Sequence, residues 1–398
     1  MVLGDSTGGI GTHVGSLSRA LLAAHRPDSP GESADLALWA PRATLERPAL
    51  AALADRGVRL LPVERSWWRQ RALLDEADIV HAHGFHAGSR VVALMRRRAR
   101  RRLVTTWHNL PPLEPAVSRI AGRSIAGLVA HGSRLSLGAS SDLVAVAVAL
   151  GARDARVCEV SAPPLPDPVR SRDEVRQLLG IDGPMVLSVS RLAPQKNLGL
   201  LLEAWEQLVA RWRIVDPDAR PPTLVIAGGG PIEAELRARV ESTDLPVRLL
   251  GQRDDVADLL GAADVAVSSS DWEARSLVAQ EALRAGVPFV GTAVGGVTGL
   301  VGDAGVLVPS RDAGALATGL FTVLTEPAVA AGLRTAGPAR AAQWPDEAQT
   351  AAFVWSCYAD VLAGPPVAKP APDAEPTTPA PSADEELHTS DTTDTSDG

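Results

Sequence analysis

The stretch Met185-Val-Leu-Ser-Val-Ser-Arg191-Leu-Ala-Pro-Gln-Lys196-Asn197 indicates the class of fold. Its first five residues form a short, mostly apolar run, as in a buried strand. A proline-containing turn then leads into a helical pattern. Short runs of this kind alternate with longer helical patterns along most of the chain. Such alternation is typical of the β–α units that build parallel sheets. The sequence therefore predicts an α/β protein.

Ten short runs are candidate strands, and they form two series of five. The first series is Leu36–Trp39, Ile79–His81, Leu103–Thr106, Gly127–His131 and Val144–Val146. The second series is Met185–Val189, Thr223–Ala227, Val247–Leu250, Val265–Ser268 and Phe289–Gly291. A chain of 398 residues also matches two domains of the usual size of roughly 150 residues. We therefore expect two Rossmann-like domains, over residues 1–165 and 166–343.

Three further segments complete the predicted organisation. Four prolines in Ser161–Pro168 remove backbone donors and predict an interdomain linker, followed by a helix at Ser171–Leu179. Residues 344–363 carry large apolar side chains at helical spacing and predict a terminal helix. Residues 364–398 are rich in proline, threonine, serine and acids, and we expect them to be disordered. This tail holds eight acids and one lysine, so it accounts for nearly all of the net charge of −8.

The composition is that of a globular protein that folds in water, with 45% hydrophobic and 22% charged residues. No apolar run reaches the ~18 residues that span a bilayer, and Met1–Ser6 lacks the features of a secretory signal, so we expect a cytoplasmic protein. The predicted folded part is nearly neutral, and its charge does not indicate a nucleic-acid partner. Cys158 and Cys357 lack the spacing of a metal or redox site, and we expect buried thiols.

A glycine-rich turn follows the short apolar start of the chain. Gly8-Gly9-Ile-Gly11 precedes apolar residues at helical spacing, and glycines at such a turn let backbone amides approach a phosphate. The spacing is not that of the dinucleotide-binding fingerprint. A bare turn and an anion-binding turn are both compatible with the pattern.

Arg191 and Lys196 follow the strand predicted at Met185–Val189. A guanidinium and an ammonium at the carboxyl end of a strand can both face a diphosphate. The chain has only two lysines, and the other, Lys369, lies in the tail, so arginine supplies every other cation of the predicted folded part. A solvated surface lysine is the alternative, but the use of lysine at this single position favours a phosphate ligand.

Two glutamates lie near the start of a predicted helix that follows the strand Val265–Ser268. Glu273 is in the loop, Ser276 is placed to cap the helix, and Glu281 falls on its second turn. Two carboxylates at such an edge suit the hydroxyl pairs of a sugar and a ribose. The alternative is that these acids only complement the positive end of the helix, which does not account for Glu273 outside it.

Together these motifs resemble those of the retaining glycosyltransferases of the GT-B fold, family 4 (glycosyl transferase group 1), whose C-terminal domain carries an Arg…Lys pair and a Glu-x7-Glu motif. The resemblance covers about residues 1–362 and extends to Asp78–His83, Thr105–Asn109, Gly228–Pro231 and Gly295-Gly296. It implies two Rossmann-like domains that face each other across a cleft. It also implies that the terminal helix, over residues 344–363, crosses back to the first domain.

The resemblance implies that a hexose moves from a nucleotide-diphosphate sugar to a glycan, glycolipid or small-molecule acceptor, with retention of configuration. Arg191 and Lys196 would contact the donor diphosphate, Glu281 the ribose hydroxyls and Glu273 the hydroxyls of the transferred sugar. His108 would lie beside the reacting sugar. No metal or other cofactor is expected, because the two cations replace it. The other candidate substrate-binding residues are Gly9 and Gly11, which would cover the phosphates, and His83, Gly229, Ser276 and Leu277.

The loop after Glu273 departs from the family pattern. Members often carry Glu-Gly-Phe-Gly-Leu-Pro where this chain has Glu273-Ala-Arg-Ser-Leu-Val278, so Arg275 and Ser276 are expected to crowd a site that is usually bare. Two rival functions are kept. One is a GT-B relative with other chemistry, such as a sugar-nucleotide epimerase or a phosphorylase. The other, which the altered loop favours, is a non-catalytic GT-B module that binds a sugar nucleotide or a partner protein.

The histidines are concentrated in the first 131 residues, apart from His388, so a catalytic imidazole must come from the first domain. His81 and His83 share one face of a strand, and with His86 they form a candidate metal set. Asp78 would point to the opposite face and no cysteine is near. Packing, or a polar lining on the acceptor side, is therefore the favoured interpretation.

Arginines dominate residues 96–102, the densest run of charge in the chain. They end an apolar helical pattern, where cations stabilise the negative end of the helix dipole. The alternative is a peripheral membrane contact, in which Arg96–Arg102 bind anionic lipid at the inner face of a membrane.

Overall fold

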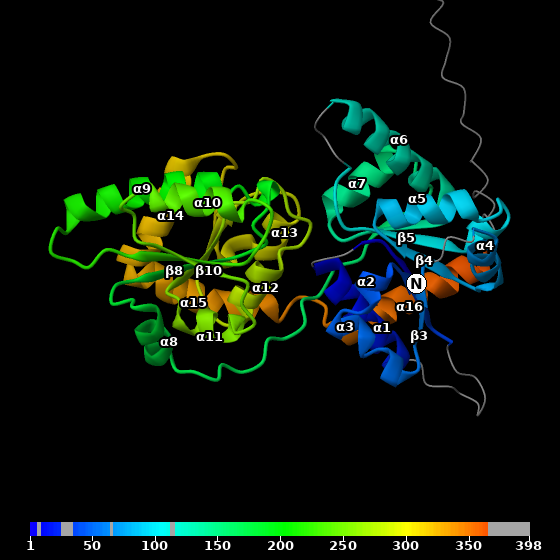
Figure 1. Cartoon of the computed structure of the whole chain (residues 1–398), viewed down its shortest axis with the longest axis horizontal. Helices are drawn as coiled ribbons and strands as arrows, with labels where there is room; N and C mark the ends of the chain where they lie inside the picture. Colours follow the sequence, from blue (N-terminus) through cyan, green and yellow to red (C-terminus); the bar gives the residue numbers. More distant parts are fainter. Residues whose placement is uncertain (6–8, 25–34, 64–66, 112–115, 365–398) are drawn as a thin grey trace, which may run out of the picture. The chain divides into compact units, whose positions relative to one another are not determined.

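The structure is a computed structural model that describes residues 1–5, 9–24, 35–63, 67–111 and 116–364 (Figure 1). The predicted disordered tail, apart from Gly364, lies outside the described residues. The fold consists of two parallel sheets whose strands fall within residues 2–157 and 185–308. The expectation of an α/β fold with two Rossmann-like halves is therefore confirmed.

The first sheet has seven parallel strands in the order β3-β2-β1-β4-β5-β6-β7. The strand order reverses its direction between β1 and β4, and such switch points are where open α/β sheets place ligand sites beyond the carboxyl ends of their strands. The strands are β1 (Val2–Leu3), β2 (Ala37–Ala40), β3 (Arg59–Pro62), β4 (Val80–His83), β5 (Leu103–Trp107), β6 (Leu135–Gly138) and β7 (Ala155–Val157).

Helices cover both faces of this sheet. The long ones are α1 (Gly9–Ala24), α4 (Trp67–Glu76), α5 (Phe85–Leu94), α6 (Ala116–Gly132) and α7 (Ser141–Ala149). Shorter turns are α2 (Arg42–Leu45), α3 (Pro48–Ala51), η1 (Ala54–Arg56) and η2 (Ala99–Arg102).

Two predicted strands of the first series are wrong. Gly127–His131 belongs to α6 and Val144–Val146 to α7, whereas the strands of this region are β6 and β7. A short apolar run fits a buried helix as well as a strand, and its periodicity alone does not separate the two. Packing decides here: a Cβ on Gly88 of α5 would lie 2.9 Å from Val129 of α6, so the two helices approach closely.

The second sheet has six parallel strands in the order β10-β9-β8-β11-β12-β13. All five predicted strands of the second series are confirmed, and β13 is additional. The strands are β8 (Met185–Val189), β9 (Thr223–Ala227), β10 (Val247–Gly251), β11 (Val265–Ser268), β12 (Phe289–Thr292) and β13 (Val306–Val308).

Hydrophobic cores lie on both faces of the second sheet, as expected for a parallel sheet. Alternation along β8 shows this directly, since Val186 packs in one core and Met185 and Leu187 pack in the other. The first core is covered mainly by α9 (Leu198–Val215), α10 (Glu233–Glu241), α14 (Ala313–Thr325) and α15 (Pro327–Ala341). The second is covered by α8 (Arg172–Leu179), α11 (Val256–Ala262), α12 (Leu277–Arg284) and α13 (Val297–Val301).

The predicted helices that flank the second sheet are also present. The helix expected at Ser171–Leu179 is α8, and Ser171 caps it in a capping box with Glu174. The terminal helix is α16 (Glu347–Ala363), which lies beside α1 (Figure 1). Trp355 of α16 donates a hydrogen bond to the carbonyl of Leu21, at 3.2 Å. The predicted return of this helix to the first domain is confirmed, and Cys158 and Cys357 are free and buried, as expected.

Among the described residues, no single helix is both long and apolar enough to cross a membrane. Helices α14 and α15 meet the same criteria only as a pair, and they are bent at 96° to each other. The apolar side of α14 is buried in the first core of the second sheet.

Candidate active site

Lys196 and Glu273 meet beyond the carboxyl ends of β8 and β11. Lys196 ends the short turn η3 (Pro194–Lys196) after β8, and its ammonium donates to Glu273 Oε1. The same oxygen accepts a hydrogen bond from Ser270 Oγ at 2.8 Å. The two side chains are only 22% and 15% exposed. The solitary lysine therefore has a carboxylate partner within the protein, so its presence does not by itself require a phosphate.

A second set of hydrogen bonds holds the two loops together. Asn197 has a positive φ of 45°, an uncommon conformation that asparagine tolerates. Its side-chain amide donates to Asp271 at 2.9 Å, and its oxygen caps α9. Ser269 Oγ donates to the carbonyl of Lys196 at 2.9 Å. These bonds position Lys196, and sequence reasoning missed Asn197 and Asp271, although an asparagine directly before a helix was a usable signal.

Arg191, the other predicted cation, is exposed at the end of β8, and within the described part of the chain it makes no hydrogen bond or ion pair. The neighbouring glycine run contributes close backbone packing. A Cβ on Gly230 would lie 2.2 Å from the carbonyl oxygen of Leu192, so only glycine fits there. The nearest atom to a Cβ on Gly229, the predicted substrate contact, would be 3.6 Å away, on Glu233. Gly229 is thus the more open of the two positions.

Helix α12 carries the remaining predicted donor residues. Ser276 caps it by accepting a hydrogen bond from the amide of Ala279 at 3.3 Å, as predicted. Glu281 lies on the second turn, and burial raises its pKa to about 7, against the opposing attraction of Arg284. Leu277 begins the helix, and a Cβ on Gly9 would lie 3.1 Å from Leu277 Cδ1. Gly9 is the first residue of α1, and Gly11 is buried on its first turn.

Arg275 does not crowd Glu273 as expected. Its guanidinium pairs with Glu159 at 2.9 Å and lies over the ring of Trp344 at 5.7 Å, and its side chain is only 5% exposed. Burial lowers its pKa. Trp272, in the same loop, donates to Asp142 of α7 at 2.7 Å. Arg275 and Trp272 therefore contact the first domain and the segment before the terminal helix, rather than the Lys196–Glu273 pair.

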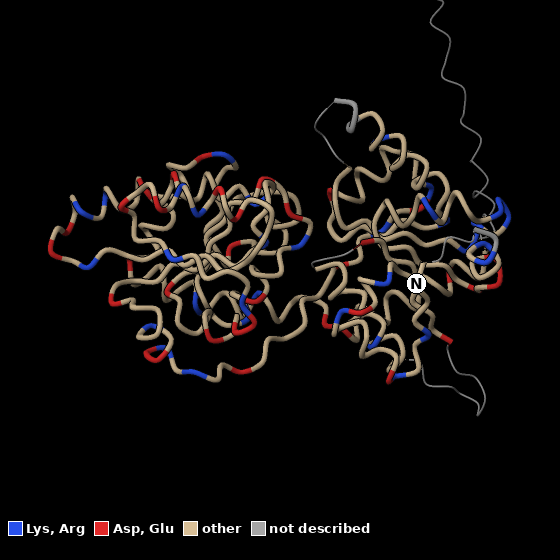
Figure 2. Tube along the Cα trace, in the orientation of Figure 1, with Lys and Arg blue, Asp and Glu red and all other residues tan. Residues whose placement is uncertain are grey.

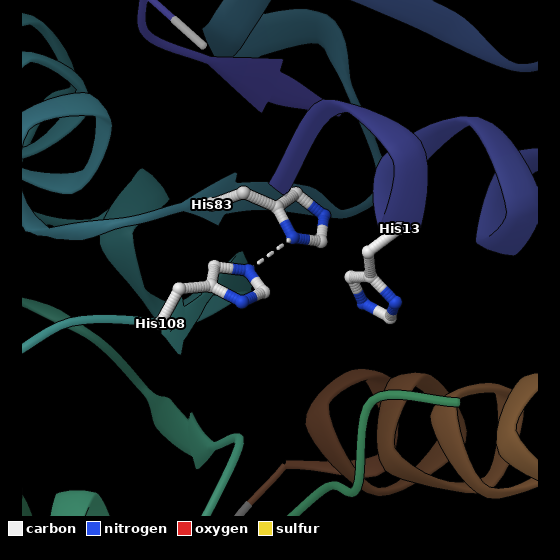
Figure 3. A group of neighbouring side chains, drawn as sticks. All are labelled: His13, His83 and His108. Atoms are coloured by element: carbon white, nitrogen blue, oxygen red, sulfur yellow. Dashed lines mark hydrogen bonds between the residues drawn. The ribbon is translucent and has the colours of Figure 1, made fainter. Parts of the chain in front are cut away.

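In the first domain, three histidines from distant positions come together (Figure 3). His13 lies on α1, His83 ends β4 and His108 follows β5, and all three are buried. His83 Nδ1 and His108 Nε2 are 3.2 Å apart, and the His13 ring centre is 5.9 Å from that of His83 and 5.4 Å from that of His108. Sequence reasoning missed His13, and its place just after the glycine turn was the available signal.

Burial keeps these imidazoles uncharged at neutral pH. It lowers the pKa of His13 to about 4, and it lowers the pKa of His83 and of His108 well below the ordinary value. His81 stacks on His83, with ring centres 4.2 Å apart. Both nitrogens of His81 are engaged, one with the Tyr358 hydroxyl at 2.7 Å and one with Thr106 Oγ1 at 2.6 Å. A metal set of His81, His83 and His86 therefore does not form.

Two family models match the chain. The model described as Glycosyltransferase Family 4 matches residues 7–149, and the model described as Glycosyl transferases group 1 matches residues 183–326. These ranges contain the histidine cluster and the Lys196–Glu273 site, respectively.

Relatives and solved structures give the same result. The chain is 30% identical over 279 residues to D-inositol 3-phosphate glycosyltransferase 2 of Catenulispora acidiphila, a match that covers 63% of each chain. It is 30% identical to D-inositol 3-phosphate glycosyltransferase of Geodermatophilus obscurus, over 71% of this chain and 69% of the relative. The fold is similar to that of Anabaena HepE, solved in complex with UDP-glucose, with a TM-score of 0.71 at 20% identity, over 89% of this chain and 99% of HepE. The chain therefore belongs to glycosyltransferase family 4, the group 1 glycosyl transferases, and has their GT-B fold.

Proposed function

We propose that this protein is a retaining glycosyltransferase that moves a hexose from a nucleotide-diphosphate sugar to a glycan, glycolipid or small-molecule acceptor. The observation that carries the proposal is the placement of Arg191, Lys196 and Glu273 at the carboxyl ends of β8 and β11. The guanidinium of Arg191 is exposed, and the ammonium of Lys196 is paired with one carboxylate. Two such cations suit the two charges of a diphosphate.

When the donor binds, its diphosphate would replace Glu273 as the ion-pair partner of Lys196. A diphosphate brings more charge to the ammonium than one carboxylate oxygen does, and Arg191 is available to bind it at the same time. Glu273, still held by Ser270, would then accept hydrogen bonds from the hydroxyls of the transferred sugar. Glu281, on the second turn of α12, would bind the ribose hydroxyls, and Gly229 would let a backbone amide approach the donor. No metal is needed for this charge balance.

Catalysis would come mainly from electrostatic preorganisation. As the sugar becomes oxocarbenium-like, negative charge grows on the leaving diphosphate, and Arg191 and Lys196 would stabilise it. His108 would lie beside the reacting sugar as a neutral imidazole, because burial lowers its pKa. The remaining candidates, Gly9, Gly11, His83, Ser276 and Leu277, would line the donor and acceptor.

The acceptor and the place of action are also part of the proposal. The relatives named D-inositol 3-phosphate glycosyltransferase support a phosphorylated polyol as one acceptor to test. Arg97, Arg98 and Arg101 are exposed around η2. Figure 2 shows basic positions gathered on the side of the first domain where Figure 1 labels α4. Arg96 instead reaches Asp75, at 3.5 Å. We place the enzyme in the cytoplasm, with peripheral contact to the inner face of a membrane.

The test is a Lys196→Ala variant assayed against UDP- and GDP-linked hexoses, with inositol phosphates among the acceptors. Loss of one charge-stabilising donor typically lowers the rate by about 10²–10³. Arg220→Ala is the matched control, because it removes a cation whose partner, Asp182, is exposed and precedes β8, at the opposite end of that strand from Lys196. Circular dichroism checks that both variants fold.

Near-normal turnover by Lys196→Ala would refute the assignment. Calorimetry with the same nucleotide sugars distinguishes the rivals. Tight binding without turnover by the wild type would favour a non-catalytic module. A new nucleotide sugar without transfer would favour an epimerase.

A further inference from the structure

His13, His83 and His108 converge on one small volume from three separate elements. One ligand nitrogen from each ring can be chosen so that all lie within 4.8 Å of one another. Figure 3 shows the rings of His83 and His108 side by side, with His13 turned toward them from α1. All three side chains are at least 93% buried. The cluster therefore consists of three imidazoles shielded from bulk water.

One pair of nitrogens in this cluster is spaced like two ligands of one metal ion. In a tetrahedral zinc site with Zn–N bonds of about 2.0–2.1 Å, adjacent nitrogens are about 3.3–3.4 Å apart. His83 Nδ1 and His108 Nε2 are 3.2 Å apart. His13 would need to move by about 1–2 Å to complete the set, which is within the reach of a small change in its side-chain torsions.

Hydrogen bonding within the cluster is incomplete. His83 Nε2 is buried and has no hydrogen-bond partner in the described part of the chain. Leaving a buried polar atom unpaired is unfavourable, so ring packing and the single contact with His108 do not satisfy the polar atoms of this imidazole. In Figure 3 the edge of the His83 ring turned toward His108 carries Nδ1, the nitrogen that would ligate the ion, and Nε2 lies on the edge away from His108.

The donor set defines the class of ion. Neutral imidazole nitrogens without thiolates suit zinc, cobalt, nickel and copper rather than magnesium or calcium, which prefer oxygen. His81 is not available as a fourth ligand, because Tyr358 and Thr106 engage its two nitrogens. Its stacking on His83 instead holds that ring in place. Three protein ligands leave one coordination position open.

We propose that His13, His83 and His108 form a binding site for a divalent transition-metal ion of the Zn²⁺ class, with one open coordination position. The proposed ligands differ from Arg191 and Lys196, which would supply the positive charge at the diphosphate. If the proposed function holds, a bound ion would hold His108 away from the sugar. Micromolar Zn²⁺ would then inhibit transfer, whereas a chelator would not lower it.

The experiment titrates the chelator-treated full chain with Co²⁺, whose visible absorption reports four-coordinate binding, and then displaces it with Zn²⁺. We expect one equivalent of Co²⁺ to bind and Zn²⁺ to replace it. His13→Ala and His13→Gln should each weaken binding by more than about 100-fold, which exceeds the loss typical when a residue that only hydrogen-bonds to a ligand is replaced. The glutamine variant keeps the size and polarity of the site if the alanine variant folds poorly.

Controls are His86→Ala and His131→Ala, which remove exposed histidines outside the cluster. Their Co²⁺ affinity should equal that of the wild type. The proposal is overturned if His13→Gln binds Co²⁺ as tightly as the wild type does. Because the absorption does not depend on turnover, Co²⁺ binding without transferase activity would support the metal site and count only against the proposed function.

Discussion

Glu281→Gln should change how the stability of the second domain depends on pH. Burial raises the pKa of Glu281 from the ordinary 4.5 to about 7. Well below pH 4.5 the carboxyl is protonated in both the folded and unfolded chain. Between pH 4.5 and 7 the unfolded chain loses its proton first, so the free energy of unfolding falls as the pH rises. Above pH 7 this loss is complete.

The size of the effect follows from the two pKa values. Each unit of difference between the two pKa values corresponds to about 1.36 kcal/mol. The free energy of unfolding therefore falls by about 3 kcal/mol between pH 4.5 and pH 8. Glutamine resembles the protonated carboxyl in shape and has no charge to bury. Glu281→Gln should therefore match the wild type near pH 4.5 and exceed its stability by about 3 kcal/mol at pH 8.

The measurement is urea unfolding of both proteins between pH 4.5 and 8, followed by tryptophan fluorescence and circular dichroism. A chain with two domains need not unfold in one step, so the transition that contains α12 must be fitted separately. Glu206→Gln is the control, since Glu206 is exposed on α9 of the same domain. A difference between Glu281→Gln and the wild type that stays constant across this pH range would refute the reasoning.

Two further predictions concern the first domain. Tyr358→Phe removes the hydroxyl bonded to His81 Nδ1 and leaves a buried nitrogen unpaired, so it should lower the free energy of unfolding by about 1–3 kcal/mol, and unchanged urea stability would contradict this. Replacing Arg97, Arg98 and Arg101 together by glutamine should weaken co-sedimentation with vesicles that contain phosphatidylserine, by about 1 kcal/mol for each arginine. Equal binding of variant and wild type, or equal binding of the wild type to neutral and to anionic vesicles, would exclude a contact between these arginines and anionic lipid.

The second domain was the more predictable half of the fold. Its strands β8 to β12 are apolar runs with clear turn signals, and all five were predicted to within two residues at each end. In the first domain, Gly127–His131 was assigned to a strand because a short apolar run has no period of its own. The helix forms there because α6 packs closely against α5, and a contact between residues so far apart in sequence leaves no local signal.

Local patterns were enough to place Arg191, Lys196, Glu273 and Glu281 at strand ends and helix starts. They did not show that Glu273 is the partner of Lys196, because these residues are 77 positions apart and meet only when β8 pairs with β11. The expected crowding by Arg275 failed for a similar reason. Its partners lie far from it in sequence: Glu159 lies between β7 and the linker, and Trp344 lies just before the terminal helix.

The sequence by itself determined the β–α rhythm, the division into two sheets and the polar residues at the strand ends, because strand and helix periods are local properties of a chain. The tertiary structure alone decided which of those residues meet, how deeply each is buried and therefore which are charged. The raised pKa of Glu281 and the convergence of His13 with His83 and His108 both arise from burial and strand order, which depend on contacts between distant segments.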